Sequence, residues 1–247
     1  MCEVHGCGAL QAPTRRRRWG AGAALASLWL GAPLAAKEAL PERGLSPQQA
    51  LAVLQQGNSR YVSGRSTARD LVAARAQHPL GQRPLAAVLC CADSRVVPEL
   101  VFDQGPGDLF VVRVAGNVVT PEGLASLEYG VRFLGVPLVM VLGHSSCGAV
   151  SAAVSVVQQQ AQLPGHLPAL AEAIRPAVEL AAQRDPAHVH AAATEGNVRH
   201  QVARLATADP LLAPQVKSGA LQVVVIGGGI AGLSSAGIRS SWAKLTL

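Results

Sequence analysis

Four short runs of the chain consist mainly of apolar residues, and they restrict the fold more than any other feature. The runs cover residues 85–91, 109–115, 138–142 and 221–226. A strand with one face in water alternates polar and apolar residues, whereas a run that is apolar on both faces belongs to a strand covered on both sides, as in parallel sheets. We therefore expect a mainly parallel central sheet with buried strands.

Helical patterns lie between and before these runs. One helix is expected to begin at the capping residue Ser46, with Pro47 in its first turn, and to end near Gly57 and Asn58. Further helices are predicted at 121–134, 149–160, 167–183 and 191–207. Alternating strands and helices predict an α/β fold with helices on both faces of the sheet. We assign residues 37–247 to this single domain.

Residues 1–36 are predicted to be a secretory signal peptide. Four arginines, 15–18, precede a Gly-, Ala- and Leu-rich stretch at 19–34 that is too short to span a bilayer, and the small residues Ala35 and Ala36 follow. Residues 16–19, Arg-Arg-Arg-Trp, fit the core of a twin-arginine signal. We expect export of the folded protein to the periplasm, with no stable membrane span. An uncleaved interfacial anchor and a basic cytoplasmic tail are the alternatives.

The charge of the chain gives no sign of a nucleic-acid partner. The 247 residues carry a formal net charge of +6, but without residues 1–36 the chain has 17 basic and 14 acidic side chains. No basic stripe with interleaved aromatic residues is present, so binding to nucleic acid is not expected. With 49% hydrophobic residues the chain is long enough to bury a sizeable core.

The cysteines favour a metal site over a disulfide framework. Cys2 and Cys7 lie in the predicted leader, so Cys90, Cys91 and Cys147 remain, which is an odd number. Successive residues of a strand point to opposite faces, so Cys90 is expected in the core while Cys91 faces elsewhere.

Cys91 ends the first apolar run, and His144 and Cys147 closely follow the third. Ligands of open α/β sheets bind at the carboxyl ends of the strands, so these side chains are expected in one crevice. Two cysteines and one histidine form a recognised catalytic zinc set, which leaves the fourth tetrahedral position to water. The alternative is a pair of buried structural thiols beside a core histidine.

Two motifs around these residues resemble the paired zinc motifs of the β-class carbonic anhydrases. They are Cys-Ala-Asp-Ser-Arg at 91–95 and His-Ser-Ser-Cys-Gly at 144–148. The resemblance runs from about residue 46 to 160 and includes the segments 57–61, 106–113 and 115–117. Each motif is weak alone, whereas the pair at this separation is highly specific.

The resemblance implies a zinc enzyme that hydrates carbon dioxide to bicarbonate and a proton through zinc-bound hydroxide. It also implies a homodimer or higher homo-oligomer, in which the helix around residues 48–61 embraces the partner and the active site forms near the interface.

Specific roles follow for residues beside the ligands. Asp93 is placed to accept a hydrogen bond from the zinc-bound water, and Arg95 to hold Asp93 by a bidentate pair. The resemblance leaves open whether Asp93 instead occupies the fourth zinc position in a closed, inactive form. A simple salt bridge at the strand end is the alternative for this pair.

Gln82, Phe110 and Gly148 are the expected substrate-binding residues, again by resemblance. A surface loop position is the alternative for Gln82. Four histidines are candidates for proton transfer, although each is also typical of a solvated surface: His166, His188, His190 and His200.

Three other functions are weighed against this one. The first is hydrolysis of carbon disulfide or carbonyl sulfide on the same scaffold, and the second is a non-catalytic zinc-binding module. The third comes from Gly-x-Gly-x-x-Gly at 227–232, which resembles the phosphate-binding turn of flavin and nicotinamide proteins. The acidic residue expected about 20 positions later would fall near or beyond Leu247, and no second strand follows, which argues against dinucleotide binding.

Overall fold

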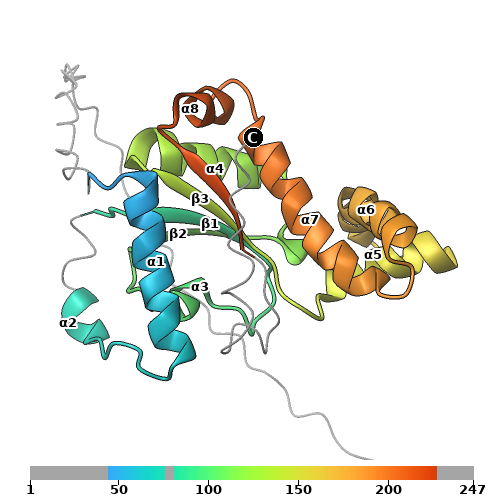
Figure 1. The fold of residues 1–247 in the computed structure, drawn as a ribbon, viewed down its shortest axis with the longest axis horizontal. Helices are drawn as coiled ribbons and strands as arrows, with labels where there is room; N and C mark the ends of the chain where they lie inside the picture. The colour runs from blue at the N-terminus through green and yellow to red at the C-terminus, as the bar shows by residue number, and fades with distance from the viewer. Residues whose placement is uncertain (1–43, 76–80, 227–247) are drawn as a thin grey trace, which may run out of the picture. The chain divides into compact units, whose positions relative to one another are not determined.

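The fold is known from a computed structural model, which describes residues 44–75 and 81–226 (Figure 1). The predicted signal peptide at 1–36 and the Gly-rich motif at 227–232 lie outside these residues. Within the described part of the chain, no helix combines the length and apolar character needed to cross a membrane.

The centre of the fold is a parallel sheet of four strands in the order β2-β1-β3-β4. The strands are β1 (Ala86–Cys90), β2 (Leu109–Arg113), β3 (Leu138–Leu142) and β4 (Gln222–Ile226). They coincide with the four apolar runs, and every residue of β1 and β3 is buried. The predicted α/β architecture with a parallel sheet is confirmed.

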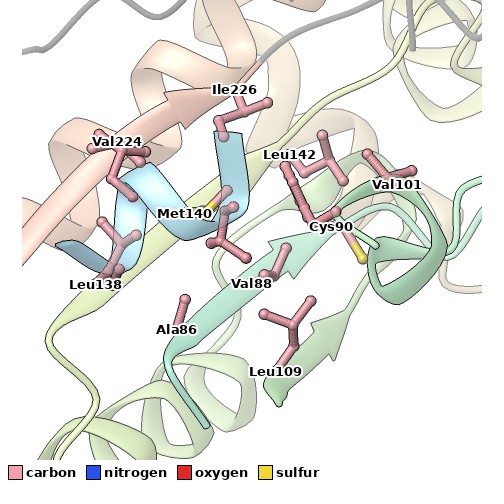
Figure 2. Packing of buried hydrophobic residues seen from close by; sticks show 14 of the residues in the cluster. Ala86, Val88, Cys90, Val101, Leu109, Leu138, Met140, Leu142, Val224 and Ile226 are labelled. Atoms are coloured by element: carbon pink, nitrogen blue, oxygen red, sulfur yellow. The ribbon is translucent and has the colours of Figure 1, made fainter. Parts of the chain in front are cut away.

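One face of the sheet is covered by α1 (Pro47–Val62) and α3 (Pro98–Val101). Figure 2 shows alternate residues of the strands, such as Val88, Cys90 and Met140, in this layer of the core. Cys90 therefore lies in the core, as predicted, and burial raises the pKa of its thiol to about 12.

The helix α1 continues one turn past the predicted end near Gly57 and Asn58, so that prediction was wrong. Both residues face the end of α3, where Val101 is its last residue and Phe102 follows. A Cβ at position 57 would lie 1.8 Å from the Phe102 carbonyl oxygen, and Asn58 Nδ2 donates to the Val101 carbonyl at 2.9 Å. Glycine and asparagine normally favour a helix end, but here they allow close contact with a neighbouring segment.

The opposite face is covered by α4 (Pro121–Leu134), α7 (Val189–Ala206) and α8 (Leu212–Ser218). A third cluster forms where α5 (Gly148–Gln159) and α6 (Leu167–Arg184) pack with the first half of α7. Figure 1 shows these three helices together beside the sheet. The cluster includes Cys91 and Cys147, so this helical layer adjoins the carboxyl ends of the strands. The remaining elements are α2 (Leu71–Arg75) and the 3₁₀ turn η2 (Ala115–Asn117).

A buried carboxylate connects α1 and the segment after it to the loop after α3. The Asp103 side chain accepts hydrogen bonds from Arg60 Nε at 2.5 Å, Arg69 Nη1 at 2.6 Å and the Thr67 backbone N–H at 3.1 Å. Only 2% of Asp103 is exposed. Burial alone would raise its pKa, but the hydrogen bonds from Arg69, Arg60 and Thr67 outweigh burial and hold the pKa well below the usual range.

We expect Asp103→Asn to lower the free energy of unfolding by about 1–3 kcal/mol, because the amide leaves buried donors without an acceptor. The lowered pKa means that the wild-type advantage is complete above the unfolded pKa of about 3.9 and shrinks as the pH falls further. Urea unfolding from pH 7 to pH 3 measures both effects.

The control is Glu195→Gln, which removes an exposed ion pair with Arg199. It is expected to change the unfolding free energy by less than about 0.5 kcal/mol. An Asp103→Asn variant as stable as this control at pH 7 would contradict the role given to Asp103.

Candidate metal centre

Strand order brings the three predicted ligands together. Cys91 directly follows β1, and His144 is the second residue after β3. Because β1 and β3 are paired in parallel, with Cys90 opposite Leu142, their carboxyl ends lie side by side. Cys147 is the N-cap of α5 and returns to the same point through a tight turn, in which Ser146 adopts a φ of 54°.

The distances within this group fit a tetrahedral metal ion. The ligand atoms of Cys91, His144 and Cys147 all lie within 4.8 Å of one another, and the two sulfurs are 3.9 Å apart. Two thiolates bound to zinc at about 2.3 Å in tetrahedral geometry would be about 3.8 Å apart. A disulfide would instead hold the sulfurs about 2.05 Å apart.

The histidine is the ligand whose surroundings fit a metal ion most clearly. His144 Nδ1 lies 2.9 Å from the Ser145 carbonyl oxygen, which selects the tautomer that donates from Nδ1 and leaves a lone pair on Nε2. His144 Nε2 is buried and has no hydrogen-bond partner among the described residues. A buried acceptor without a partner is costly, and binding a metal ion would satisfy it.

The two thiols affect one another strongly. The Cys147 thiol lowers the pKa of Cys91, and His144 and the Gly116 backbone N–H also favour the Cys91 thiolate. The pKa of Cys147 is raised, first by Cys91 and then by burial, because a second thiolate would lie beside the first. A divalent cation between the sulfurs would offset this repulsion and stabilise both thiolates.

Asp93 and Arg95 form a bidentate ion pair beside this group. Arg95 Nε donates to Asp93 Oδ1 at 2.9 Å and Arg95 Nη2 to Oδ2 at 2.7 Å, and the Arg95 backbone N–H also donates to Oδ1. Hydrogen bonding from Arg95 holds the pKa of Asp93 well below its usual range. Asp93 Oδ2 lies 3.9 Å from His144 Nε2, so an ionised carboxylate adjoins the candidate metal position. Its catalytic role stays a prediction.

Arg113 is a site residue to which the sequence analysis gave no role. Its Nη2 donates to the carbonyl oxygens of Asp93 at 2.6 Å and Val96 at 2.9 Å, and its Nε donates to the Cys91 carbonyl at 3.2 Å. These bonds hold the whole turn that carries Cys91 and Asp93. The sequence did contain a sign of this role, because Arg113 is the one charged residue in the apolar run 109–115.

Gly116 also contacts a candidate ligand directly. Its backbone N–H donates to Cys91 Sγ at 3.2 Å. Gly116 has a φ of 70°, and a Cβ there would lie 2.7 Å from Ile174 Cδ1. Both the backbone conformation and the available space therefore require glycine.

The three predicted substrate-binding residues lie at different distances from the candidate metal group. Gly148 follows Cys147 at the start of α5, and a Cβ on it would meet no described atom within 4 Å. Phe110 lies opposite Ala87 in the sheet. Ala87 is four residues before Cys91, so Phe110 lies about 13 Å along the strand direction from the metal group. Gln82 is exposed in the segment that leads into the amino end of β1. Within one chain, Phe110 is thus not brought to the metal group.

Of the four candidate histidines, His190 has a hydrogen-bonded connection toward the metal group. Its Nε2 lies 2.9 Å from Ser151 Oγ, and Ser151 Oγ donates to the Cys147 carbonyl at 3.2 Å. His188 instead pairs with Asp185 on the surface. A role of any of the four in proton transfer stays a prediction.

Comparisons with known proteins agree with this geometry. The family model described as "Carbonic anhydrase" matches residues 86–231. Carbonic anhydrase 2 of Mycobacterium tuberculosis (strain CDC 1551 / Oshkosh) is 39% identical over 180 residues, which cover 72% of this chain and 86% of that protein. A carbonic anhydrase of Mycolicibacterium smegmatis is 43% identical over 136 residues, covering 55% of this chain and 66% of that protein.

Solved structures with the same fold are β-carbonic anhydrases. The enzyme CcaA matches with a TM-score of 0.59 and 25% identity, covering 75% of this chain and 91% of that chain. The β-carbonic anhydrase of Coccomyxa, solved in complex with acetazolamide, matches with a TM-score of 0.56 and 25% identity, covering 74% and 83%.

Proposed function

The chain belongs to the carbonic anhydrase family, in its β class, and from this premise we propose that it interconverts carbon dioxide and bicarbonate at a zinc ion held by Cys91, His144 and Cys147. The observation that carries the proposal is the group of two thiol sulfurs and one imidazole nitrogen within 4.8 Å of one another, in which the nitrogen has no hydrogen-bond partner from the described part of the chain. Three ligands leave one tetrahedral position for the reacting molecule, as in catalytic zinc sites.

When bound, zinc supplies the Lewis acidity that makes water a nucleophile near neutral pH. The carboxylate of Asp93 holds a proton of the attacking water by accepting its hydrogen bond, and this orients the oxygen lone pair toward carbon dioxide. Arg95 keeps that carboxylate ionised and fixed in place. Arg113 keeps the backbone of the same turn rigid, so the ligand Cys91 and the carboxylate hold their relative positions.

We expect Asp93→Asn to lower the turnover number for carbon dioxide hydration about 100-fold with zinc content unchanged, because the amide is a poor proton acceptor. Stopped-flow assays from neutral to alkaline pH, with zinc measured on the same samples, test this. Glu195→Gln, which removes an exposed ion pair with Arg199, is the control and should keep wild-type turnover.

The same assays separate the rival functions. A non-catalytic zinc-binding module predicts that Asp93→Asn changes no measurable property, and a zinc-loaded wild type without hydration activity would overturn the proposal. Parallel assays with carbon disulfide and carbonyl sulfide test the hydrolase alternative. The relatives and solved structures described above are named as carbonic anhydrases, which supports carbon dioxide as the substrate.

We further propose a homodimer in which each chain completes the other's site. Within the described residues, β2 is an edge strand, and its residue Phe110 begins a row of aromatic contacts that continues through Tyr129 and Phe133 of α4. Tyr129 is 48% and Phe133 70% exposed. An open strand edge next to exposed aromatic rings is typical of a protein interface.

A twofold axis gives this dimer a functional consequence. If two copies of β2 pair antiparallel, the amino end of one strand lies beside the carboxyl end of the other. Phe110 of one copy would then approach the strand ends that carry Cys91 in its partner. The substrate-binding role predicted for Phe110 is thus compatible with its distance from the metal group of its own chain. In contrast, the buried side of α1 packs on its own sheet, so only the opposite side is free to embrace a partner.

We expect Phe133→Glu to weaken the dimer at least tenfold, because a charge would be buried in the aromatic contact. Analytical ultracentrifugation over a range of concentrations measures dissociation, and turnover per zinc should fall as the dimer dissociates. Leu180→Glu on α6, another exposed apolar position, is the control and should leave the dimer intact. A wild type that is monomeric and fully active would contradict the proposal.

We also propose that residues 1–36 direct export to the periplasm, on the basis of the arginine run and the apolar stretch after it. Cell fractionation of a bacterial host compares wild type with the double variant Arg16→Lys and Arg17→Lys. Retention of the double variant in the cytoplasm is the expected result. Unchanged delivery to the periplasm would remove the twin-arginine route.

A further inference from the structure

Two amide side chains are buried on the apolar side of α7. Asn197 is 1% and Gln201 0% exposed, and they alternate with the core residues Val198 and Val202. Burying such groups costs free energy unless their hydrogen bonds are made inside the protein. Neither residue belongs to the candidate metal group or contacts it directly, so their position calls for another explanation.

Both amides are connected to the segment 116–119. Asn197 Nδ2 donates to the Gly116 carbonyl at 2.8 Å, and Gln201 Oε1 accepts from the Val119 backbone N–H at 3.0 Å. Gln201 Nε2 also donates to Asn197 Oδ1 at 3.0 Å, which fixes the orientation of Asn197. Arg204 Nη1 donates to the Val119 carbonyl at 3.2 Å. The helix thus holds this segment at both ends.

Gly116 connects the amides of α7 to the metal group. Its backbone N–H donates to Cys91 Sγ at 3.2 Å, while its carbonyl accepts from Asn197. Gly116 cannot shift easily, because Ile174 and Ala149 fill the space next to its Cα. A short hydrogen-bonded chain therefore runs from Gln201 through Asn197 and Gly116 to a ligand sulfur.

We propose that Asn197, oriented by Gln201, is a positioning residue for the zinc ligand Cys91 and slows the loss of the metal. The inference rests on the zinc site of the proposed function. An N–H···S bond draws electron density from the thiolate and fixes the direction of its lone pairs. Asn197 keeps the Gly116 N–H aimed at the sulfur by holding the same residue through its carbonyl. Partners of this kind around a metal site typically change metal affinity about 10–100-fold when removed.

The test must separate this role from simple core packing, since Asn197 also helps to attach α7. Asn197→Leu keeps the number and branching of the side-chain heavy atoms and removes both hydrogen bonds. Val202→Ala is the matched control. It removes buried contacts from the same helix, but Val202 packs against apolar side chains on the face of the sheet. Gln201→Met is a second variant, which keeps the approximate length of the side chain, adds no charge, and removes the donor to Asn197 together with the acceptor for the Val119 N–H.

Zinc release from each full-length, zinc-loaded protein to an excess of a coloured chelator is followed at a temperature at which all variants remain folded. We expect Asn197→Leu to release zinc at least tenfold faster than wild type, Gln201→Met to release it faster by a smaller factor, and Val202→Ala to stay within about twofold. The cobalt-substituted proteins provide a second readout. The thiolate-to-cobalt absorption band should shift in Asn197→Leu and not in Val202→Ala.

Equal release rates for Asn197→Leu and Val202→Ala, with an unshifted cobalt band, would overturn the inference. If Asn197→Leu does not fold, Gln201→Met decides by the same comparison. A wild type that holds zinc and does not hydrate carbon dioxide would refute the proposed function and leave this inference standing. A wild type that binds no zinc would refute both.

Discussion

The parallel pairing of β1 with β3 is the contact on which the candidate metal centre depends. Cys91 and His144 are 53 positions apart in the sequence, and each follows the carboxyl end of its strand. Backbone hydrogen bonds between the strands set Cys90 opposite Leu142, and this register places both ligands at one edge of the sheet. Cys147 needs only the short turn after His144 to join them.

Around the candidate ligands, the protein supplies hydrogen-bond donors and acceptors from four separate segments. Arg113 at the end of β2 holds the turn after β1, and the Gly116 N–H reaches the Cys91 sulfur. Ser145 selects the tautomer of His144, and Arg95 fixes the carboxylate of Asp93. Each of these groups restricts one ligand or its neighbour, so the fold itself contributes to the direction in which each ligand atom points.

The helical layer on one side of the sheet has more than a packing function. The helix α7 covers the sheet with Val198 and Val202, while Asn197 and Gln201 on the same helix hold the segment 116–119. A substitution in this helix can therefore affect stability and the metal centre separately. Such coupling through a backbone peptide is not visible from the metal ligands alone.

The local sequence was sufficient to predict the strands and the larger helices, because apolar periodicity and capping residues act over short distances. It failed at the end of α1, where Gly57 and Asn58 have the residue types of a helix end. In the folded chain they contact Phe102 and Val101. The short helices α2, α3 and α8 were not predicted, since four to seven residues carry little periodic signal.

The sequence by itself determined the α/β class, the parallel sheet and the three candidate zinc ligands, because these depend on residue type and on spacing along the chain. Asp93 and Arg95 beside the ligands were also expected, but only the tertiary structure decided which groups from distant parts of the sequence surround them. Arg113, Gly116 and Asn197 act through backbone atoms that are distant in sequence, and no local pattern specifies such a hydrogen bond. The tertiary structure also placed Phe110 far from the metal group of its own chain, because strand register, and not sequence distance, sets how far along the sheet a residue lies.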